Sequence, residues 1–144
     1  MRKQYHFRKS PEGLLAWDVG NLIQLTKDLS AEWIPLSSIR ELDEPYWYES
    51  GSDEPTCRSI AEHIRLINET DLAYPIIICP VGRVMDGMHR VVKALVEGKG
   101  QIQAYRLPQL PPPDFVGVNP DALPYDDSMI HQAGTAQRCD GFRR

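Results

Sequence analysis

The run VMDGMHRVVKA places an acid, a glycine, a histidine and an arginine between two apolar stretches. The pattern predicts a strand that ends near Asp86, a turn at Gly87 and a helix that begins near His89. A helix N-terminus presents unpaired backbone N–H groups and the positive end of the helix dipole, so it attracts anions. With His89 and Arg90 beside it, and Lys93 one turn further on, this N-terminus predicts a phosphate-binding site.

Asp86 adds a second kind of chemistry to this site. A carboxylate beside phosphate usually coordinates Mg2+ or accepts a proton, so the group predicts nucleotide or phosphoryl chemistry with Asp86 in one of these two roles. A purely structural interpretation stays open on spacing alone. In that interpretation Asp86 is a turn residue before Gly, His89 packs, and Arg90 and Lys93 lie on a solvated helix face with Glu97.

The composition narrows the class of protein. The chain has 144 residues, 42% of them hydrophobic, which is enough for one domain with a real core. A net charge of -4 argues weakly against a non-specific DNA binder. No signal peptide and no apolar run of about 20 residues is visible, so we expect a cytoplasmic protein with no membrane partner. Cys57, Cys79 and Cys139 are far apart and predict neither a disulfide framework nor a zinc site.

In the first third of the chain the pattern predicts few regular elements. Residues 1–12 are expected to be a mobile polar leader. AWDVGNLIQLTKDL predicts a helix with Asp18 as its N-cap. EWIPLSSI predicts a short strand, which Pro35 places at a sheet edge or at a strand start. Residues 43–55 are expected to form a polar, acidic loop.

The middle of the chain has stronger signals. TCRSIAEHIRLINET predicts the best helix, with Ile60, Ile64 and Ile67 as an apolar stripe. YPIIIC predicts a buried strand, and RVM predicts the second arm of a hairpin. HRVVKALVEG predicts a helix ended by Gly98, and QIQAYRL predicts a closing strand. Three residues of that last helix are expected to face the core: Val91, Val92 and Leu95.

Together these elements predict an α+β fold: a small mixed β-sheet packed with helices. An extra N-terminal helix precedes the sheet, and a Pro-rich C-terminal extension follows it. We therefore divide the chain into a leader and helix at 1–32, a central domain at 33–107, and a Pro-rich extension with a flexible tail at 108–144.

Over residues 33–107 the order of elements and the strings YPIII and DGMHR resemble the ParB/sulfiredoxin superfamily. In that superfamily the segment between the last hairpin and its helix binds nucleotide phosphates. DGMHR is closest to the D-G-H-H-R string of the free serine kinases, which move phosphate from ADP or ATP to serine. Met88 replaces the first histidine of that string, and it also stands where sulfiredoxins have their nucleophilic cysteine. The sequence shows no helix-turn-helix or dimerisation pattern, so we do not expect a complete DNA-segregation factor.

The resemblance implies roles for particular residues. Glu41, Asp86 and His89 would be catalytic, with Asp86 coordinating Mg2+ or orienting the nucleotide and Glu41 taking the proton of a substrate hydroxyl. Glu41 is preferred to Asp43 and Glu44 because it most directly follows the first strand, although a solvated acidic loop is an equal alternative. The residues implied to bind nucleotide or phosphate are Gly87, Met88, His89, Arg90, Lys93, Thr56 and Arg58. For Thr56 and Arg58 the alternative is a helix cap and a surface residue.

The resemblance therefore implies a nucleotide-binding protein that uses ATP or another nucleotide with Mg2+. Its activity would be phosphotransfer to, or nucleotide hydrolysis on, a small hydroxyl substrate. The alternative is a nucleotide-controlled binding module for DNA or a protein partner, without catalysis, with the Pro-rich segment as partner segment. Tyr46, Trp47 and Tyr48 would stack on a base, shape a substrate pocket or anchor the loop to the core. His63 is expected to pack or hydrogen-bond, with a catalytic role as the alternative.

Overall fold

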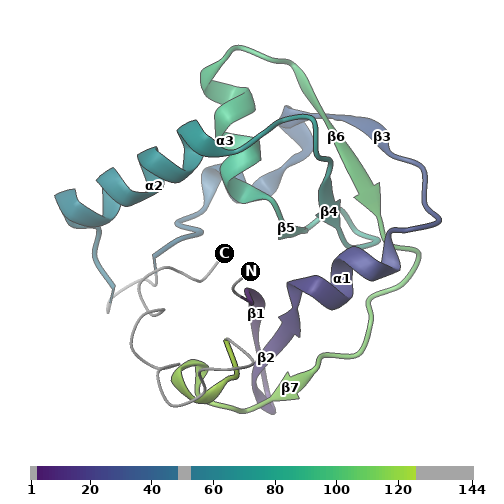
Figure 1. Cartoon of the computed structure of the whole chain (residues 1–144), viewed down its shortest axis with the longest axis vertical. Helices are drawn as coiled ribbons and strands as arrows, with labels where there is room; N and C mark the ends of the chain where they lie inside the picture. The colour runs from purple at the N-terminus through teal and green to yellow at the C-terminus, as the bar shows by residue number, and fades with distance from the viewer. Residues whose placement is uncertain (1–2, 49–52, 126–144) are drawn as a thin grey trace.

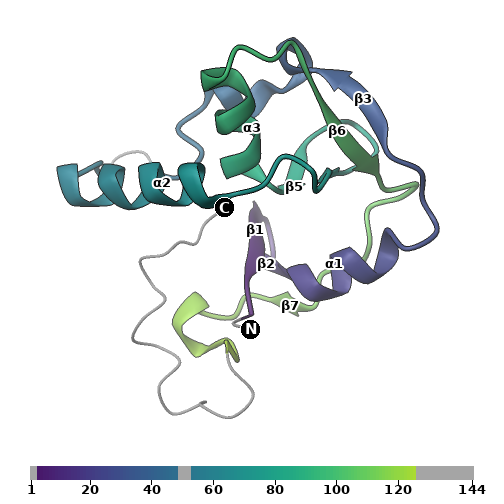
Figure 2. The same cartoon turned by 45° about the horizontal axis from the view of Figure 1, so that its top comes forward.

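The computed structural model describes residues 3–48 and 53–125 (Figure 1). This part of the chain has an α+β fold with two small sheets, which confirms the predicted class. The two sheets lie at opposite ends of the molecule, and a short helix, α1 (Val19–Leu25), lies between them (Figures 1 and 2). None of the helices in the described ranges is long and apolar enough to cross a membrane.

The larger sheet is the predicted mixed sheet. Its strand order is β3 (Glu32–Pro35), β6 (Gln101–Arg106), β4 (Ile76–Ile78) and β5 (Val84–Asp86). β4 runs parallel to β6, and the other two strand pairs are antiparallel. β3 lies at the sheet edge, where the missing N–H of Pro35 costs no ladder hydrogen bond.

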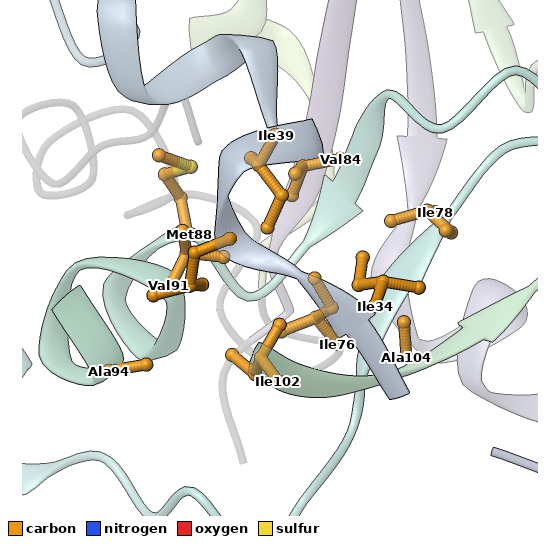
Figure 3. Packing of buried hydrophobic residues seen from close by; sticks show 11 residues of the cluster. Ile34, Ile39, Ile76, Ile78, Val84, Met88, Val91, Ala94, Ile102 and Ala104 are labelled. Atoms are coloured by element: carbon orange, nitrogen blue, oxygen red, sulfur yellow. The ribbon is translucent and has the colours of Figure 1, made fainter. Parts of the chain in front are cut away.

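Helix α3 (Met88–Val96) closes the main core against this sheet. In Figure 3 the α3 residues Met88, Val91 and Ala94 lie to the left of the strand residues Ile76 and Ile102, and all five belong to one buried cluster. β4 is buried along its whole length, as predicted for a β-branched run in a central strand. The main cluster comprises Ile34, Leu36, Ile39, Ile76, Ile78, Val84, Met88, Val91, Ala94, Ile102 and Ala104.

The predicted mobile leader at residues 1–12 is wrong. β1 (Tyr5–Ser10) and β2 (Gly13–Asp18) form an antiparallel hairpin, and β7 (Phe115–Val116) pairs with β2 to complete the smaller sheet. Charged residues in YHFRKS conceal an alternation of apolar and polar side chains, which is the signal of a half-buried strand. The apolar side chains of this sheet pack with those of the C-terminal extension, namely Tyr5, Phe7, Ala16, Phe115, Val118, Leu123 and Tyr125.

The Pro-rich extension lies on the N-terminal hairpin as far as residue 125. The Asp114 carboxylate accepts hydrogen bonds from the backbone N–H of Asp18 and from the Asn21 side chain. The Trp17 indole donates to the Pro111 carbonyl at 2.8 Å. A 3-10 turn, Pro120–Ala122, follows β7. The flexible tail that we predict for the last residues lies outside the described part of the chain.

Helix α1 joins the two sheets. Asp18 is its N-cap, as predicted, and accepts a hydrogen bond from the Gly20 N–H at 2.8 Å. The second core cluster combines residues of this N-terminal segment with residues of the larger sheet and its flanks: Trp17, Leu22, Ile77, Cys79, Met85 and Leu107. The N-terminal segment therefore shares a core with the central domain.

Helix α2 (Cys57–Glu69) is present where predicted, but its apolar stripe is not buried. Ile60 and Ile64 are 45% and 51% exposed, and α2 extends away from the body of the molecule (Figures 1 and 2). The helix meets α3 through a neighbouring side, where His63 contacts His89. A similar correction applies to Leu95 near the end of α3, which is 52% exposed.

The turn before α3 generates a stability prediction. Gly87 has φ +111°, and an added Cβ would lie 2.6 Å from Cγ2 of Ile76. Gly87→Ala should lower the free energy of unfolding by about 1–2 kcal/mol for the left-handed backbone and by a further ~1–3 kcal/mol for overpacking. Gly98→Ala is the matched control, because Gly98 has φ +77° but a Cβ there would meet no described atom within 4 Å. Equal losses for both variants in urea unfolding would contradict the close-packing argument.

Candidate functional site

The DGMHR segment has the predicted strand–turn–helix geometry. β5 ends at Asp86, Gly87 is the N-cap of α3, and the helix begins at Met88. The Gly87 carbonyl accepts the first hydrogen bonds of the helix, from the N–H groups of Arg90 and Val91 at 3.0 Å. The segment approaches the Ile76 side chain so closely that only glycine fits at the turn.

Arg90 is engaged in holding the fold together. Its Nη1 donates to the carbonyls of Tyr74 and Pro75, each at 2.9 Å, and its Nη2 donates to the Asp86 carboxylate at 2.9 Å. The guanidinium thereby ties the segment before β4 to the start of α3. Arg90 would have to give up these contacts to bind phosphate, so we assign it a structural role in this arrangement.

Lys93 has a similar structural assignment. Its Nζ donates to the carbonyls of Thr70 at 2.7 Å and of Asn68 at 3.3 Å. These carbonyls belong to the C-terminal end of α2, where a positive charge is favourable. Lys93 therefore anchors α2 to α3, and its ammonium points at backbone oxygens rather than at a phosphate site.

The predicted metal role of Asp86 does not fit this arrangement. Asp86 is buried, and its Oδ2 forms a salt bridge of 2.9 Å with Arg90. Within the described residues, no three or more His, Cys, Asp and Glu side chains gather where a metal ion could bind. A carboxylate that is already paired with a guanidinium is a poor metal ligand, so we assign no metal ion to Asp86 in this arrangement.

Glu41 is the acidic residue that stands out in the 41–44 segment. It lies in the 3-10 turn Arg40–Asp43 and is 2% exposed, whereas Asp43 and Glu44 are exposed. Its Oε2 accepts a hydrogen bond from the Val84 N–H at 2.8 Å and pairs with Nε of Arg83 at 3.2 Å. Its Oε1 is buried and has no hydrogen-bond partner among the described residues. The contacts of Oε2 thus orient the carboxylate, whereas Oε1 lacks a hydrogen-bond donor among the described residues.

Arg83 connects the two glutamates. It donates to Glu44 through Nη2 at 2.7 Å and Nη1 at 3.0 Å, in addition to its contact with Glu41. The hydrogen bonds with Glu44 and the charges of Glu41 and Glu44 outweigh burial and raise the pKa of Arg83. The same hydrogen bonds, with the charge of Arg83, hold the pKa of Glu44 below its usual range.

A small pocket brings Glu41 and α3 together. Its volume is about 220 Å3, below the ~300–1,000 Å3 of pockets for drug-sized ligands. Met88 also lines it, although this residue is 3% exposed and belongs to the main core. The lining residues are Glu41, Leu42, Glu44, Pro45, Tyr46, Trp47, Tyr48, Met88 and Val92. The aromatic residues of the predicted loop therefore shape a pocket and also pack against the core.

Beside the pocket, Trp47 stacks on two histidines. Its ring centroid lies 4.1 Å from that of His63 and 4.6 Å from that of His89. The two imidazoles contact each other, with 2.9 Å between Nδ1 of His63 and Nε2 of His89. The sequence predicts that His63 packs or hydrogen-bonds, with a catalytic role as the alternative. It indicates no partner for His63, because no spacing rule relates positions on two different helices.

Thr56 and Arg58 fit their structural alternatives. Thr56 is the N-cap of α2, and its hydroxyl accepts from the Ser59 N–H at 3.1 Å within a capping box. Arg58 is exposed near the start of the same helix. Neither residue lines the pocket.

Comparison with family models, curated proteins and solved structures finds no match to this chain. The resemblance to the ParB/sulfiredoxin superfamily therefore remains a prediction from motif and element order.

The Glu41–Arg83 pair predicts a large loss of stability when its cation is removed. Arg83→Met should lower the free energy of unfolding by about 3 kcal/mol, because it leaves the Glu41 charge buried without its cation. Arg106→Met is the matched control, since Arg106 pairs with Glu32 on the surface at 3.2 Å. That variant should change stability by no more than about 1 kcal/mol. If chemical denaturation shows similar losses of unfolding free energy for Arg83→Met and Arg106→Met, the burial of Glu41 does not depend on its pairing with Arg83.

Proposed function

We propose that the protein is a nucleotide-dependent phosphotransferase that acts on a small hydroxyl-bearing molecule, with Glu41 as proton acceptor. One observation carries this proposal. The same pocket is lined by the buried Glu41, whose Oε1 has no hydrogen-bond partner in the described part of the chain, and by Met88 at the N-terminus of α3. An acceptor group thus lies beside a helix end suited to phosphate.

The contacts of Glu41 support its role as base. The Val84 N–H and Arg83 hold Oε2, so the carboxylate cannot turn freely. The buried Oε1 needs a hydrogen-bond donor, because an unsatisfied buried oxygen is costly. A substrate hydroxyl in the pocket supplies that donor and places its proton within reach of the carboxylate.

The size of the pocket supports a small acceptor. A volume of about 220 Å3 suits a small molecule better than a whole nucleotide. The nucleotide would lie outside, with its terminal phosphate at the first N–H groups of α3 and beside His89. Mg2+ would arrive as part of the nucleotide substrate, since the protein shows no metal-binding group within its described residues.

The reaction follows from this placement. The hydroxyl of the acceptor gives its proton to Oε1 of Glu41 while its oxygen forms a bond to the terminal phosphorus. The bond between that phosphorus and the bridging oxygen breaks, and its electron pair leaves with the shortened nucleotide. The N-terminus of α3 and a protonated His89 stabilise the negative charge on the transferred group.

The exposed stripe of α2 supports the alternative function. Ile60 and Ile64 present apolar surface that the described part of the chain does not cover. Such surface is typical of a contact with another molecule. A nucleotide-controlled binding module without catalysis would use it, and binding without turnover would favour this alternative.

The test separates binding from turnover. Thermal stability is measured with the Mg2+ complexes of ATP, ADP, CTP and GTP, and turnover is followed as nucleotide conversion with a panel of small alcohols. One nucleotide at 100 times its dissociation constant should add about 2.7 kcal/mol of stability. Glu41→Gln should keep that binding and lose turnover by a factor on the order of 10²–10⁴. Asp43→Asn is the control, because Asp43 is exposed in the same 3-10 turn, does not line the pocket and should retain turnover.

Wild-type turnover in Glu41→Gln would exclude Glu41 as the base. No stabilisation by any of the four nucleotides would exclude nucleotide binding altogether.

A further inference from the structure

His63 has no part in the function proposed above, yet it makes a close polar contact with His89. Nδ1 of His63 and Nε2 of His89 are 2.9 Å apart, which is a hydrogen-bond distance. The two nitrogens can form this bond only if one carries a proton and the other offers a lone pair. One proton must therefore lie between the rings.

Proton counting shows what this contact imposes. If both rings are neutral, the proton on the inner contact decides which outer nitrogen is a donor and which is an acceptor. One added proton makes both outer nitrogens donors and leaves the inner bond intact. A second added proton would put hydrogens on both inner nitrogens and break the bond. The pair can therefore take up one proton and keep the bond between the rings, but it must break that bond to take up a second.

The surroundings hold the two rings in this geometry. Trp47 stacks on both imidazoles. The rings of Tyr48 and His63 are arranged edge to face, with 5.8 Å between their centroids. The charged side chains on the same elements are largely engaged elsewhere or exposed. Arg90 and Lys93 donate hydrogen bonds to backbone carbonyls. The ion pairs are those of Arg65 with Glu62 and Glu69, and of Glu44 with Arg83. Arg58 and Glu97 are exposed.

We propose that His63 and His89 act as one unit that shares a single proton, and that His63 is a positioning residue for His89. His63 would fix the tautomer of His89 and keep the pair singly charged, so that His89 presents a donor to the phosphate. The ligand in this inference rests on the proposed function. The shared proton itself does not, because it follows from the contact between the rings.

The first test needs no ligand. Histidine side-chain 15N signals of the full chain are titrated from pH 4 to 9 in the wild type, in His63→Asn and in His63→Phe. His89→Gln identifies the His89 signal among the four histidines. In the wild type the His89 signal should follow two linked steps, and in both variants it should follow one. An identical His89 curve in all three proteins would overturn the shared proton.

The second test separates hydrogen bonding from packing. His63→Asn keeps a polar group near the position of Nδ1 but loses the ring, whereas His63→Phe keeps a ring and loses the nitrogen. A positioning role predicts that His63→Asn binds the Mg2+ complex of whichever of the four nucleotides the wild type binds nearly as well as wild type, and that His63→Phe binds it about tenfold more weakly. The opposite order, or equal affinities, would overturn it.

The two tests fail independently of each other. If the wild type binds none of the four nucleotides, the proposed function fails, while the titration still decides whether the histidines share a proton. If the titration shows two linked steps but His63→Phe binds that nucleotide as tightly as wild type, the pair exists and does not position His89 for phosphate.

Discussion

The close contact between the Gly87 backbone and the Ile76 side chain is the constraint on which the arrangement of the site depends. A Cβ at position 87 would lie 2.6 Å from Cγ2 of Ile76, so α3 can begin here only because the residue is glycine. This contact sets the axis of α3 against β4. On that helix, Met88 belongs to the core and lines the pocket, and His89 stacks on Trp47. Lys93 donates a hydrogen bond to a carbonyl at the C-terminal end of α2.

Glu41 shows a second constraint, which concerns charge. A buried carboxylate is costly unless it is paired and hydrogen-bonded. Arg83 and the Val84 N–H satisfy one oxygen, and the other oxygen has no partner among the described residues. A sequence under selection for stability alone has no need of such a group, and buried ionisable residues beside a pocket are frequent at functional sites. This unsatisfied oxygen supports the proposed role of Glu41 as proton acceptor.

The sequence predicted the local elements better than their contacts. Asp18 as N-cap, the hairpin of β4 and β5, and the turn at Gly87 followed from capping, periodicity and glycine, which act over a few residues. The N-terminal strand was missed because charged residues masked its alternation. The structural roles of Arg90 and Lys93, and the pairing of His63 with His89, depend on residues 15 to 26 positions apart. Local patterns carry no information on such contacts.

We propose above that nucleotide phosphate binds at the N-terminus of α3, next to Glu41. The most direct measurement is the change in backbone amide chemical shifts of the 15N-labelled protein as the Mg2+ complexes of the four nucleotides are added in turn. We predict that one nucleotide shifts the amides of Met88 and His89 most strongly, because these N–H groups would face its phosphate. Largest shifts on another element, or no shifts with any of the four at millimolar concentration, would contradict the account.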